Sequence, residues 1–144
     1  MAWRMSWAYI AGFLDGEGSV NCYDGKQSGR NSVRRVFRVQ LYQNSEIVLE
    51  EIQDFLARNR IPSKLRYHNR PDRISKGHKG SWMLTVEGAV PTYRFLRSVE
   101  KYVIVKHLKV QEALAYIEDL GEKARDGELH PNSAWAYLKI GRRD

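Results

Sequence analysis

Two carboxylates near the N-terminus have the spacing and surroundings to do chemistry. Asp15 and Glu17 alternate with glycines at the end of an apolar segment, and a helix is predicted over Trp7–Asp15 with Ser6 as N-cap and Gly16 as C-terminal stop. Glu17 would then lie just past the helix C-terminus, where the helix dipole disfavours a carboxylate unless it is protonated or close to a cation. Glu17 is therefore either a ligand for a hard cation such as Mg²⁺ or an ordinary exposed acid in a turn. Asp15 is interpreted as a residue that caps or braces the helix end.

The same helix carries a stripe of small residues. Ala8, Gly12 and Gly16 recur every four residues, so they share one side of the helix. Such a stripe lets a second helix approach backbone against backbone. From the residues alone, the stripe either packs on the protein's own sheet or forms a symmetric contact with a second copy of the chain. The larger side chains of the helix are expected to point into the core: Tyr9, Phe13 and Leu14.

The elements that would position these residues form an α+β fold in a single domain of residues 1–144. Alternating apolar residues predict strands, and apolar residues at helical spacing predict helices. The predicted strands are Ser19–Tyr23, Val33–Gln43, Ser63–His68 and Ser81–Val86, with a turn or loop from Asp24-Gly25. The later helices are predicted from Asn44 or Ser45 to about Arg58, over Tyr93–Val99, over Lys106–Leu120 and over Asn132–Ile140. In the third of these, Gly121 is the predicted stop, and the residues at helical spacing that are expected inside are Leu108, Ala113, Leu114 and Ile117. This order predicts an antiparallel four-stranded, saddle-like sheet with helices on one face and the other face free.

The charge distribution indicates a polyanion as partner. The net charge is +7, and residues 30–80 hold twelve basic against five acidic side chains, so this middle third carries the excess. The alternative is a solvated basic surface without a partner. The single cysteine excludes an internal disulfide, and no apolar run approaches the roughly 18 residues of a membrane span. With no secretory signal at the start, the protein is expected in the compartment where it is made, the cytoplasm or nucleoid or an organelle.

The predicted strands alternate apolar residues with residues that recognise nucleic acid. Arginine pairs with guanine and glutamine or asparagine with adenine, and a twisted two-stranded ribbon fits the major groove. Val33–Gln43 would span roughly 35 Å, enough to follow about ten base pairs. The polar face is predicted to comprise Asn21, Tyr23, Arg34, Arg38, Gln40, Tyr42, Lys64, Arg66 and His68. Phosphate contacts are predicted in the loop that follows, from Arg70, Arg73, Lys76 and Lys79.

Residues 10–18, Ile-Ala-Gly-Phe-Leu-Asp-Gly-Glu-Gly, resemble the LAGLIDADG signature of homing endonucleases. Ala11, Gly12, Asp15 and Gly18 match it, and Glu17 keeps the acid where the signature has its second aspartate. No internal repeat is visible, so the chain holds one copy of the motif. The resemblance implies a homodimer with the motif helix at its interface. It further implies a metal-dependent double-strand break in a long, near-palindromic DNA target, in the service of intron or intein mobility.

The resemblance also implies roles for individual residues. Glu17 and the backbone carbonyl of Gly16 would bind Mg²⁺, for which Ca²⁺ or Mn²⁺ can substitute. Gln43 and Lys106 would flank the metal and order the water around the attacked phosphate, whereas Ile47 stands where some relatives carry a basic residue. The dimer interface would comprise Ala8, Ala11, Gly12, Asp15 and Gly16.

Three alternatives remain open from the sequence. A non-cleaving nucleic-acid-binding protein, either an intron RNA maturase or a DNA-binding regulator, would keep both the paired helices and the basic sheet. A different nuclease would use His68, Asn69 and His78, which are scattered in a basic loop. A structural basic protein, such as a ribosome component, would need neither the motif nor the alternation on two strands.

Overall fold

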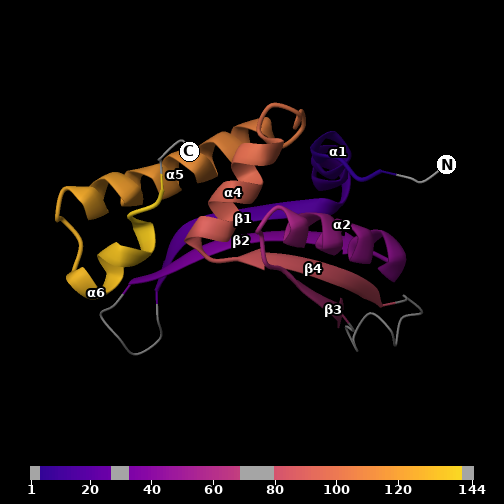
Figure 1. Ribbon diagram of the computed structural model, residues 1–144, viewed down its shortest axis with the longest axis horizontal. Coiled ribbons are helices and arrows are strands. Elements are labelled where there is room, and N and C mark those ends of the chain that lie inside the picture. The colour runs from indigo at the N-terminus through magenta and orange to yellow at the C-terminus, as the bar shows by residue number, and fades with distance from the viewer. Residues whose placement is uncertain (1–3, 27–32, 69–79, 141–144) are drawn as a thin grey trace.

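The computed structural model describes residues 4–26, 33–68 and 80–140. They form an antiparallel sheet of four strands in the order β1-β2-β4-β3 with helices on one side, which confirms the predicted α+β class (Figure 1). The elements run α1 (Trp7–Glu17), β1 (Gly18–Lys26), β2 (Val33–Gln43), α2 (Glu46–Arg58), β3 (Lys64–His68), β4 (Ser81–Glu87), α4 (Ala89–Val99), α5 (His107–Arg125), α6 (Pro131–Ala134) and the 3₁₀ turn η1 (Trp135–Tyr137).

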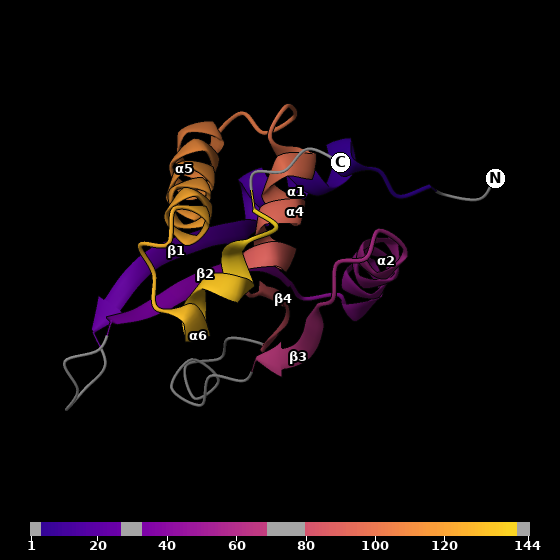
Figure 2. The ribbon, with the colours of Figure 1, turned by 60° about the vertical axis from the view of Figure 1, so that its left-hand side comes forward.

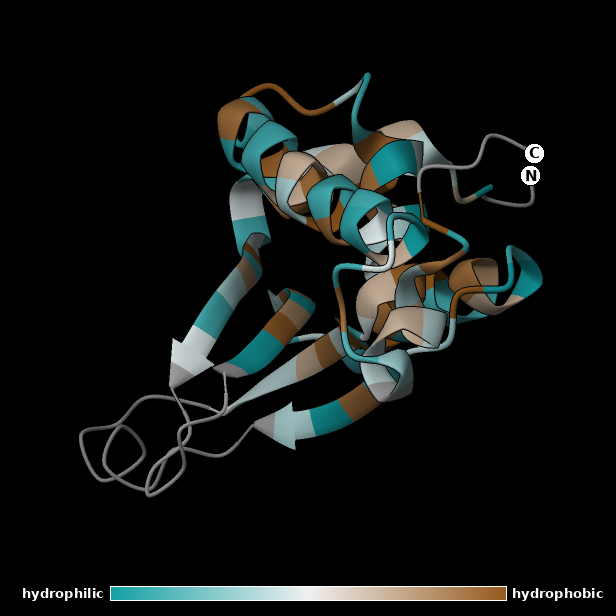
Figure 3. Ribbon diagram, turned by 90° about the vertical axis from the view of Figure 1, so that its left-hand side faces the viewer, coloured by the Kyte–Doolittle hydropathy of each residue, from teal (hydrophilic) through white to brown (hydrophobic). Residues whose placement is uncertain are grey.

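The two faces of the sheet differ because successive side chains of a strand point to opposite sides. On β2, Val39 and Leu41 are 1% exposed and pack under the helices, and the paired strands add Val20, Leu84 and Val86 to the same core. The hydrophobic and hydrophilic residues of the strands alternate visibly in Figure 3. In the part of the chain that the structure describes, the opposite face of the sheet carries no helix (Figures 1 and 2). The core is thus one layer between the sheet and its helices, and among the described residues the other face of the sheet is not covered by a helix (Figures 1 and 2).

The first helix begins where predicted but ends later. The hydroxyl of Ser6 accepts a hydrogen bond from the backbone N–H of Tyr9 at 3.1 Å, which confirms the N-cap. Gly16, however, lies inside α1, and the helix ends at Glu17 with Gly18 as C-cap, whose N–H donates to the carbonyl of Leu14. A side chain at Gly18 would place its Cβ 2.6 Å from Leu14 Cδ1. The backbone of residue 18 thus lies so close to Leu14 that any larger residue would force Leu14 to shift, which favours glycine there, and the predicted stop at Gly16 is wrong.

Other predicted boundaries of strands and helices also differ from those in the structure. Asp24 and Gly25 do not form a turn but continue β1, paired with Arg35 and Arg34. Gly121 does not end α5 but lies within it, buried against the C-terminal segment, where an added Cβ would be 3.0 Å from the Cβ of Ile140. The expected helix over Asn132–Ile140 is split into α6 and η1.

Leu108 is 70% exposed rather than internal, and the inner side of α5 comprises Val110, Ala113, Leu114, Ile117 and Leu120. Among the described residues, no helix is long and apolar enough to span a bilayer.

Candidate metal site and nucleic-acid interface

The small-residue stripe of α1 faces away from the protein's own core. Ala8, Gly12 and Gly16 are exposed, and a Cβ added at Gly12 or Gly16 would meet nothing within 4 Å. The helix packs on the sheet through its other side, where Ile10 and Leu14 are fully buried. The interpretation that the stripe packs on the chain's own sheet is therefore wrong, and packing within the protomer does not explain the two glycines.

Two expectations for α1 need correction. Ala11 was predicted at the dimer interface, but it is 0% exposed in the core of its own chain and has no surface to offer a second subunit. Tyr9 was predicted to point into the core, but it is 40% exposed and its ring lies 6.3 Å from that of Phe13. Helical spacing alone does not fix the exact edge of the buried side of a helix. Tyr9 and Ala11 both lie close to that edge, Tyr9 on the exposed side and Ala11 on the buried side.

Asp15 connects the end of α1 to the start of α5. Its carboxylate accepts hydrogen bonds from the backbone N–H groups of Ile104 at 2.8 Å and Lys106 at 3.0 Å, so it binds the α4–α5 connection directly before α5 rather than the end of its own helix. Lys106 in turn donates from Nζ to the backbone carbonyl of Asp15 at 2.7 Å. Asp15 thus braces α1 through a reciprocal contact between segments far apart in sequence. The ribbon shows the α4–α5 connection close to α1 (Figures 1 and 2).

The electrostatics of this contact favour the ionised carboxylate. Burial raises the pKa of Asp15, but hydrogen bonds from the backbone of Ile104, Lys106 and Val105 and the positive charge of Lys106 outweigh it. The pKa of Asp15 therefore lies below its ordinary value of 3.8. Because the folded state binds the proton less readily than the unfolded state, the contact stabilises the fold above pH 3.8, and this contribution is lost as the pH falls through the folded-state pKa.

Removing the Asp15 carboxylate is expected to destabilise the protein in a pH-dependent way. Asp15→Ala should lower the free energy of unfolding by about 1.5–3 kcal/mol at neutral pH, the usual contribution of hydrogen bonds to a charged group. Urea unfolding of both proteins across pH should show a constant difference near neutrality that shrinks below pH 3.8. Asp126→Ala, at an exposed position after α5, is the matched control and should change much less. Equal stability at neutral pH, or a difference that persists unchanged in acid, would refute the stabilising contact between Asp15 and the α4–α5 connection.

The three residues assigned to catalysis lie toward the same end of α1. Glu17 is the exposed last residue of that helix, and Lys106 reaches the carbonyl two residues earlier. Gln43 is the last residue of β2, two positions beyond the pair Gly18↔Leu41, so its register places it beside the helix end. Its Oε1 accepts from the backbone N–H of Asn44 at 2.8 Å. A carboxylate, backbone carbonyls, an ammonium and a carboxamide thus gather at one end of the sheet.

This donor set fits a hard divalent cation but is incomplete. The carboxylate of Glu17 and the carbonyl of Gly16 are oxygen donors of the kind that Mg²⁺ and Ca²⁺ prefer, and both lie at the negative end of a helix dipole. Within residues 4–26, 33–68 and 80–140, no three His, Cys, Asp or Glu side chains gather into a ligand cluster. A cation held at Glu17 would therefore take further oxygen ligands from water, from a phosphate or from another chain.

Strand register brings the predicted polar residues together on the free face of the sheet. Gln40 lies between Ser19 of β1 and Thr85 of β4, and Thr85 in turn pairs with Lys64 of β3. The same face includes Asn21, Tyr23, Arg34, Arg38, Tyr42 and Arg66. His68 falls on this face by register, but its side chain lies outside the described residues, as do Arg70, Arg73, Lys76 and Lys79.

The structure adds residues to this face that were not predicted. Met83 pairs with both Tyr42 and Arg66, and Glu87 lies opposite Arg38 with 4.0 Å between Arg38 Nε and Glu87 Oε1. The alternation of Ser81, Met83, Thr85 and Glu87 with the apolar residues of β4 was the signal for them. These side chains set which parts of the face are basic, apolar or acidic.

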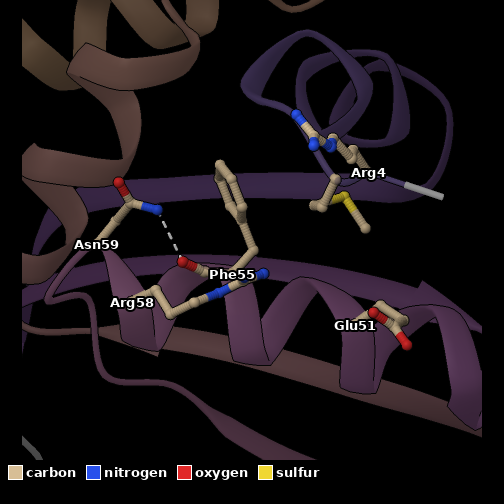
Figure 4. Close-up of a pocket in the computed structure, with 6 residues that line it drawn as sticks. Arg4, Glu51, Phe55, Arg58 and Asn59 are labelled. Atoms are coloured by element: carbon tan, nitrogen blue, oxygen red, sulfur yellow. Dashed lines mark hydrogen bonds between the residues drawn. The ribbon is translucent and has the colours of Figure 1, made fainter. Parts of the chain in front are cut away.

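Two surface clefts differ in their relation to this face. One, of about 170 Å³, is lined by residues of β2 and the end of β4: Arg34, Arg35, Val36, Phe37, Arg38, Glu87 and Gly88. Its three arginines suit an anion, and two of them were predicted to contact nucleic acid. The other, of about 410 Å³, lies between the N-terminal segment and α2 and is lined by Arg4, Met5, Glu51, Phe55, Arg58 and Asn59 (Figure 4). None of the predicted site residues lines this second cleft.

Comparisons with known structures agree with the fold. The homing endonuclease I-CvuI in complex with its target in the presence of Ca has a TM-score of 0.62 at 19% identity, over 94% of this chain and 79% of that one. The group I intron-encoded I-CeuI complexed with DNA has a TM-score of 0.64 at 17% identity, over 99% and 70%. The archaeal intron-encoded I-Vdi141I complexed with DNA has a TM-score of 0.55 at 22% identity, over 96% and 85%. The chain therefore has the LAGLIDADG homing endonuclease fold.

Among curated protein sequences, none matches the chain. A family model described as a LAGLIDADG-like domain matches residues 5–100, which is more than half of the chain and extends from α1 through α4. The matched segment includes the motif helix and all four strands of the sheet. The chain therefore belongs to the LAGLIDADG-like domain family.

Proposed function

We propose that this protein is a homodimeric, Mg²⁺-dependent DNA endonuclease that breaks both strands of a long, near-palindromic target, in the service of intron or intein mobility. One observation supports this above the others. The glycine stripe of α1 faces solvent while Glu17 and Lys106 lie at the end of the same helix. A second α1 on that stripe would bring two such ends together, which a monomeric function would not need.

The proposed dimer uses more surface than the stripe. A stable interface buries about 800 Å² on each partner, and alanine and glycine side chains of one helix supply little of it. Three large apolar side chains near the same end of α1 are strongly exposed: Ile104 at 82%, Val105 at 78% and Leu108 at 70%. The backbone of this segment is bound to Asp15, so it keeps a fixed position relative to α1. We assign these side chains to the second part of the interface.

Each active site would be built from residues already in place. Glu17 and the carbonyl of Gly16 would hold Mg²⁺, for which Ca²⁺ or Mn²⁺ could substitute. Bound there, the ion would polarise the scissile phosphate, lower the pKa of a water and neutralise charge on the leaving oxygen. Lys106 would add positive charge beside that phosphate, and its contact with the carbonyl of Asp15 limits how far it can swing. Gln43 would hydrogen-bond and orient the attacking water.

The free face of the sheet would bind the DNA. Arg34, Arg38, Gln40 and Tyr42 project from one strand, and Lys64 and Arg66 lie across the sheet from them. Two identical subunits would read two half-sites related by a two-fold axis, so the target would be nearly palindromic. A non-cleaving regulator could use the same face, but it would have no need of an exposed carboxylate at the end of the paired helices. Two named structures with this fold, I-Vdi141I and I-CeuI, are complexes with DNA.

Selection from a randomised DNA pool tests this function. Sequences that bind the protein in Ca²⁺ would be enriched and then exposed to Mg²⁺, and the cut ends would be sequenced. The expected result is breaks in both strands at a fixed position within a nearly two-fold symmetric consensus. Binding without cutting in Mg²⁺ or Mn²⁺ would favour the regulator, and an asymmetric consensus would contradict the homodimer.

A further inference from the structure

One glutamine on the free face is held in a defined orientation. Gln40 lies in the middle of β2, part-buried between its cross-strand neighbours Ser19 and Thr85. The hydroxyl of Tyr42 donates a hydrogen bond to Gln40 Oε1 at 3.1 Å, and Gln40 Nε2 donates to the thioether sulfur of Met83 at 3.3 Å. Tyr42 and Met83 pair directly across β2 and β4. The carboxamide is therefore held at both ends by residues of its own face.

Met83 and Tyr42 also determine on which side of the Gln40 carboxamide the nitrogen lies and on which side the oxygen lies. A thioether can only accept a hydrogen bond, so the amino end must face Met83. In the opposite orientation Oε1 would face the sulfur of Met83, so two hydrogen-bond acceptors would be in contact. The N–H that now donates to the sulfur would lose this acceptor. The hydroxyl of Tyr42 supplies a donor where the oxygen lies. The orientation of Gln40 thus follows from the chemistry of its neighbours.

The remaining hydrogen-bonding capacity of Gln40 matches one base. After these two contacts, Nε2 still has one N–H and Oε1 still has an acceptor site. In the major groove, adenine offers the complement, an N6 donor beside an N7 acceptor. Guanine offers two acceptors, N7 and O6, and O6 would face the carboxamide oxygen. A glutamine that is already oriented also loses less side-chain freedom on binding than a free one.

We infer that Gln40 selects an A·T pair in each DNA half-site, and that Tyr42 and Met83 are positioning residues that fix its carboxamide for this contact. This inference rests on the proposed function, because it requires the free face of the sheet to enter the major groove. It assigns Tyr42 and Met83 a role different from direct base contact. Loss of either side chain should therefore reduce the preference for A·T over the other base pairs rather than abolish DNA binding.

The test is a base-by-base binding profile in Ca²⁺, measured on the selected target and all of its single base-pair variants. The folded wild-type protein should prefer A·T at one symmetric pair of positions by roughly 5- to 150-fold over the other pairs, the usual range for a good bidentate contact. Gln40→Leu should remove that preference and leave the other positions unchanged. Gln40→Arg should move the preference at the same position to guanine.

The positioning role has its own variants. Tyr42→Phe removes only the hydroxyl and Met83→Leu removes only the sulfur acceptor at similar volume, and each should reduce the preference several-fold at that position. Tyr67→Phe, on the opposite face of the sheet, is the matched control and should leave the profile unchanged. A profile unaltered by Gln40→Leu would overturn the inference while DNA binding stood. Unaltered profiles for both positioning variants would overturn their role, and failure of the folded wild-type protein to bind any DNA would overturn the proposed function itself.

Discussion

Glu17→Gln is expected to abolish double-strand cleavage while DNA binding survives. Glutamine keeps the size of the side chain but removes the charge that would hold the cation, and rates should fall by about 10²- to 10³-fold or more. The fold should not suffer, because Glu17 is exposed at a helix C-terminus, where the dipole disfavours a carboxylate. Binding in Ca²⁺ should be equal or tighter, because one negative charge beside the phosphates is gone.

Cleavage of the selected target in Mg²⁺ and binding in Ca²⁺ would be measured on the same preparations. Glu128→Gln makes the same chemical change at an exposed position after α5 and serves as the control, with cleavage expected at the wild-type rate. A Glu17→Gln protein that cuts as fast as the wild type would remove Glu17 from the active site. Loss of both binding and cleavage would instead show that Glu17 acts in DNA binding.

Gly12→Leu is expected to convert the dimer to a monomer. In its own chain, a Cβ at Gly12 meets nothing within 4 Å, so the isolated protomer can accept a larger side chain there. Leucine is also a better helix former than glycine, by up to about 1 kcal/mol. Between two helices that approach through glycine, however, a leucine on each would push the backbones apart. Sedimentation should therefore show a folded monomer, and cleavage should be lost with the dimer.

A leucine introduced on another helix serves as the control for Gly12→Leu. Ala115 is exposed on α5, and Ala115→Leu should leave the dimer intact. Thermal unfolding followed by circular dichroism would show that both variants keep their fold. A Gly12→Leu protein that still sediments as a dimer would place the interface elsewhere on the molecule.

Local pattern was enough to predict most of the fold. Val33–Gln43 was predicted with both of its ends because apolar and polar residues alternate from Phe37 to Tyr42, and such alternation indicates a sheet with one covered face. The glycines misled the prediction of helix ends. Gly121 lies against Ile140 and is explained by this neighbour from outside the helix, whereas Gly16 lies on an open helix surface that only the proposed dimer would cover. A contact of that kind does not show in local sequence.

The candidate site was predictable only in part for the same reason. The motif placed Glu17 at a helix end, and strand alternation placed Gln40 and Tyr42 on one face. The acceptor role of Asp15 toward Ile104 and Lys106 spans some ninety residues of sequence, and no local pattern encodes it. The exposure of the segment that starts at Ile104 depends on the same contact, and its apolar side chains would be assigned to the core from composition alone.

Cysteine cross-linking along α1 tests the central claim most directly. Single cysteines at Ala8, Gly12 and Gly16, each with Cys22→Ser, would be oxidised and compared with Ala115→Cys in the same background. A disulfide requires Cα atoms about 4.4–6.8 Å apart, a distance that only closely packed helices provide across a dimer. The account predicts rapid formation of a covalent dimer at one or more stripe positions, still able to bind the selected DNA. Cross-linking at all three positions that is no faster than at Ala115 would contradict the pairing of α1 helices.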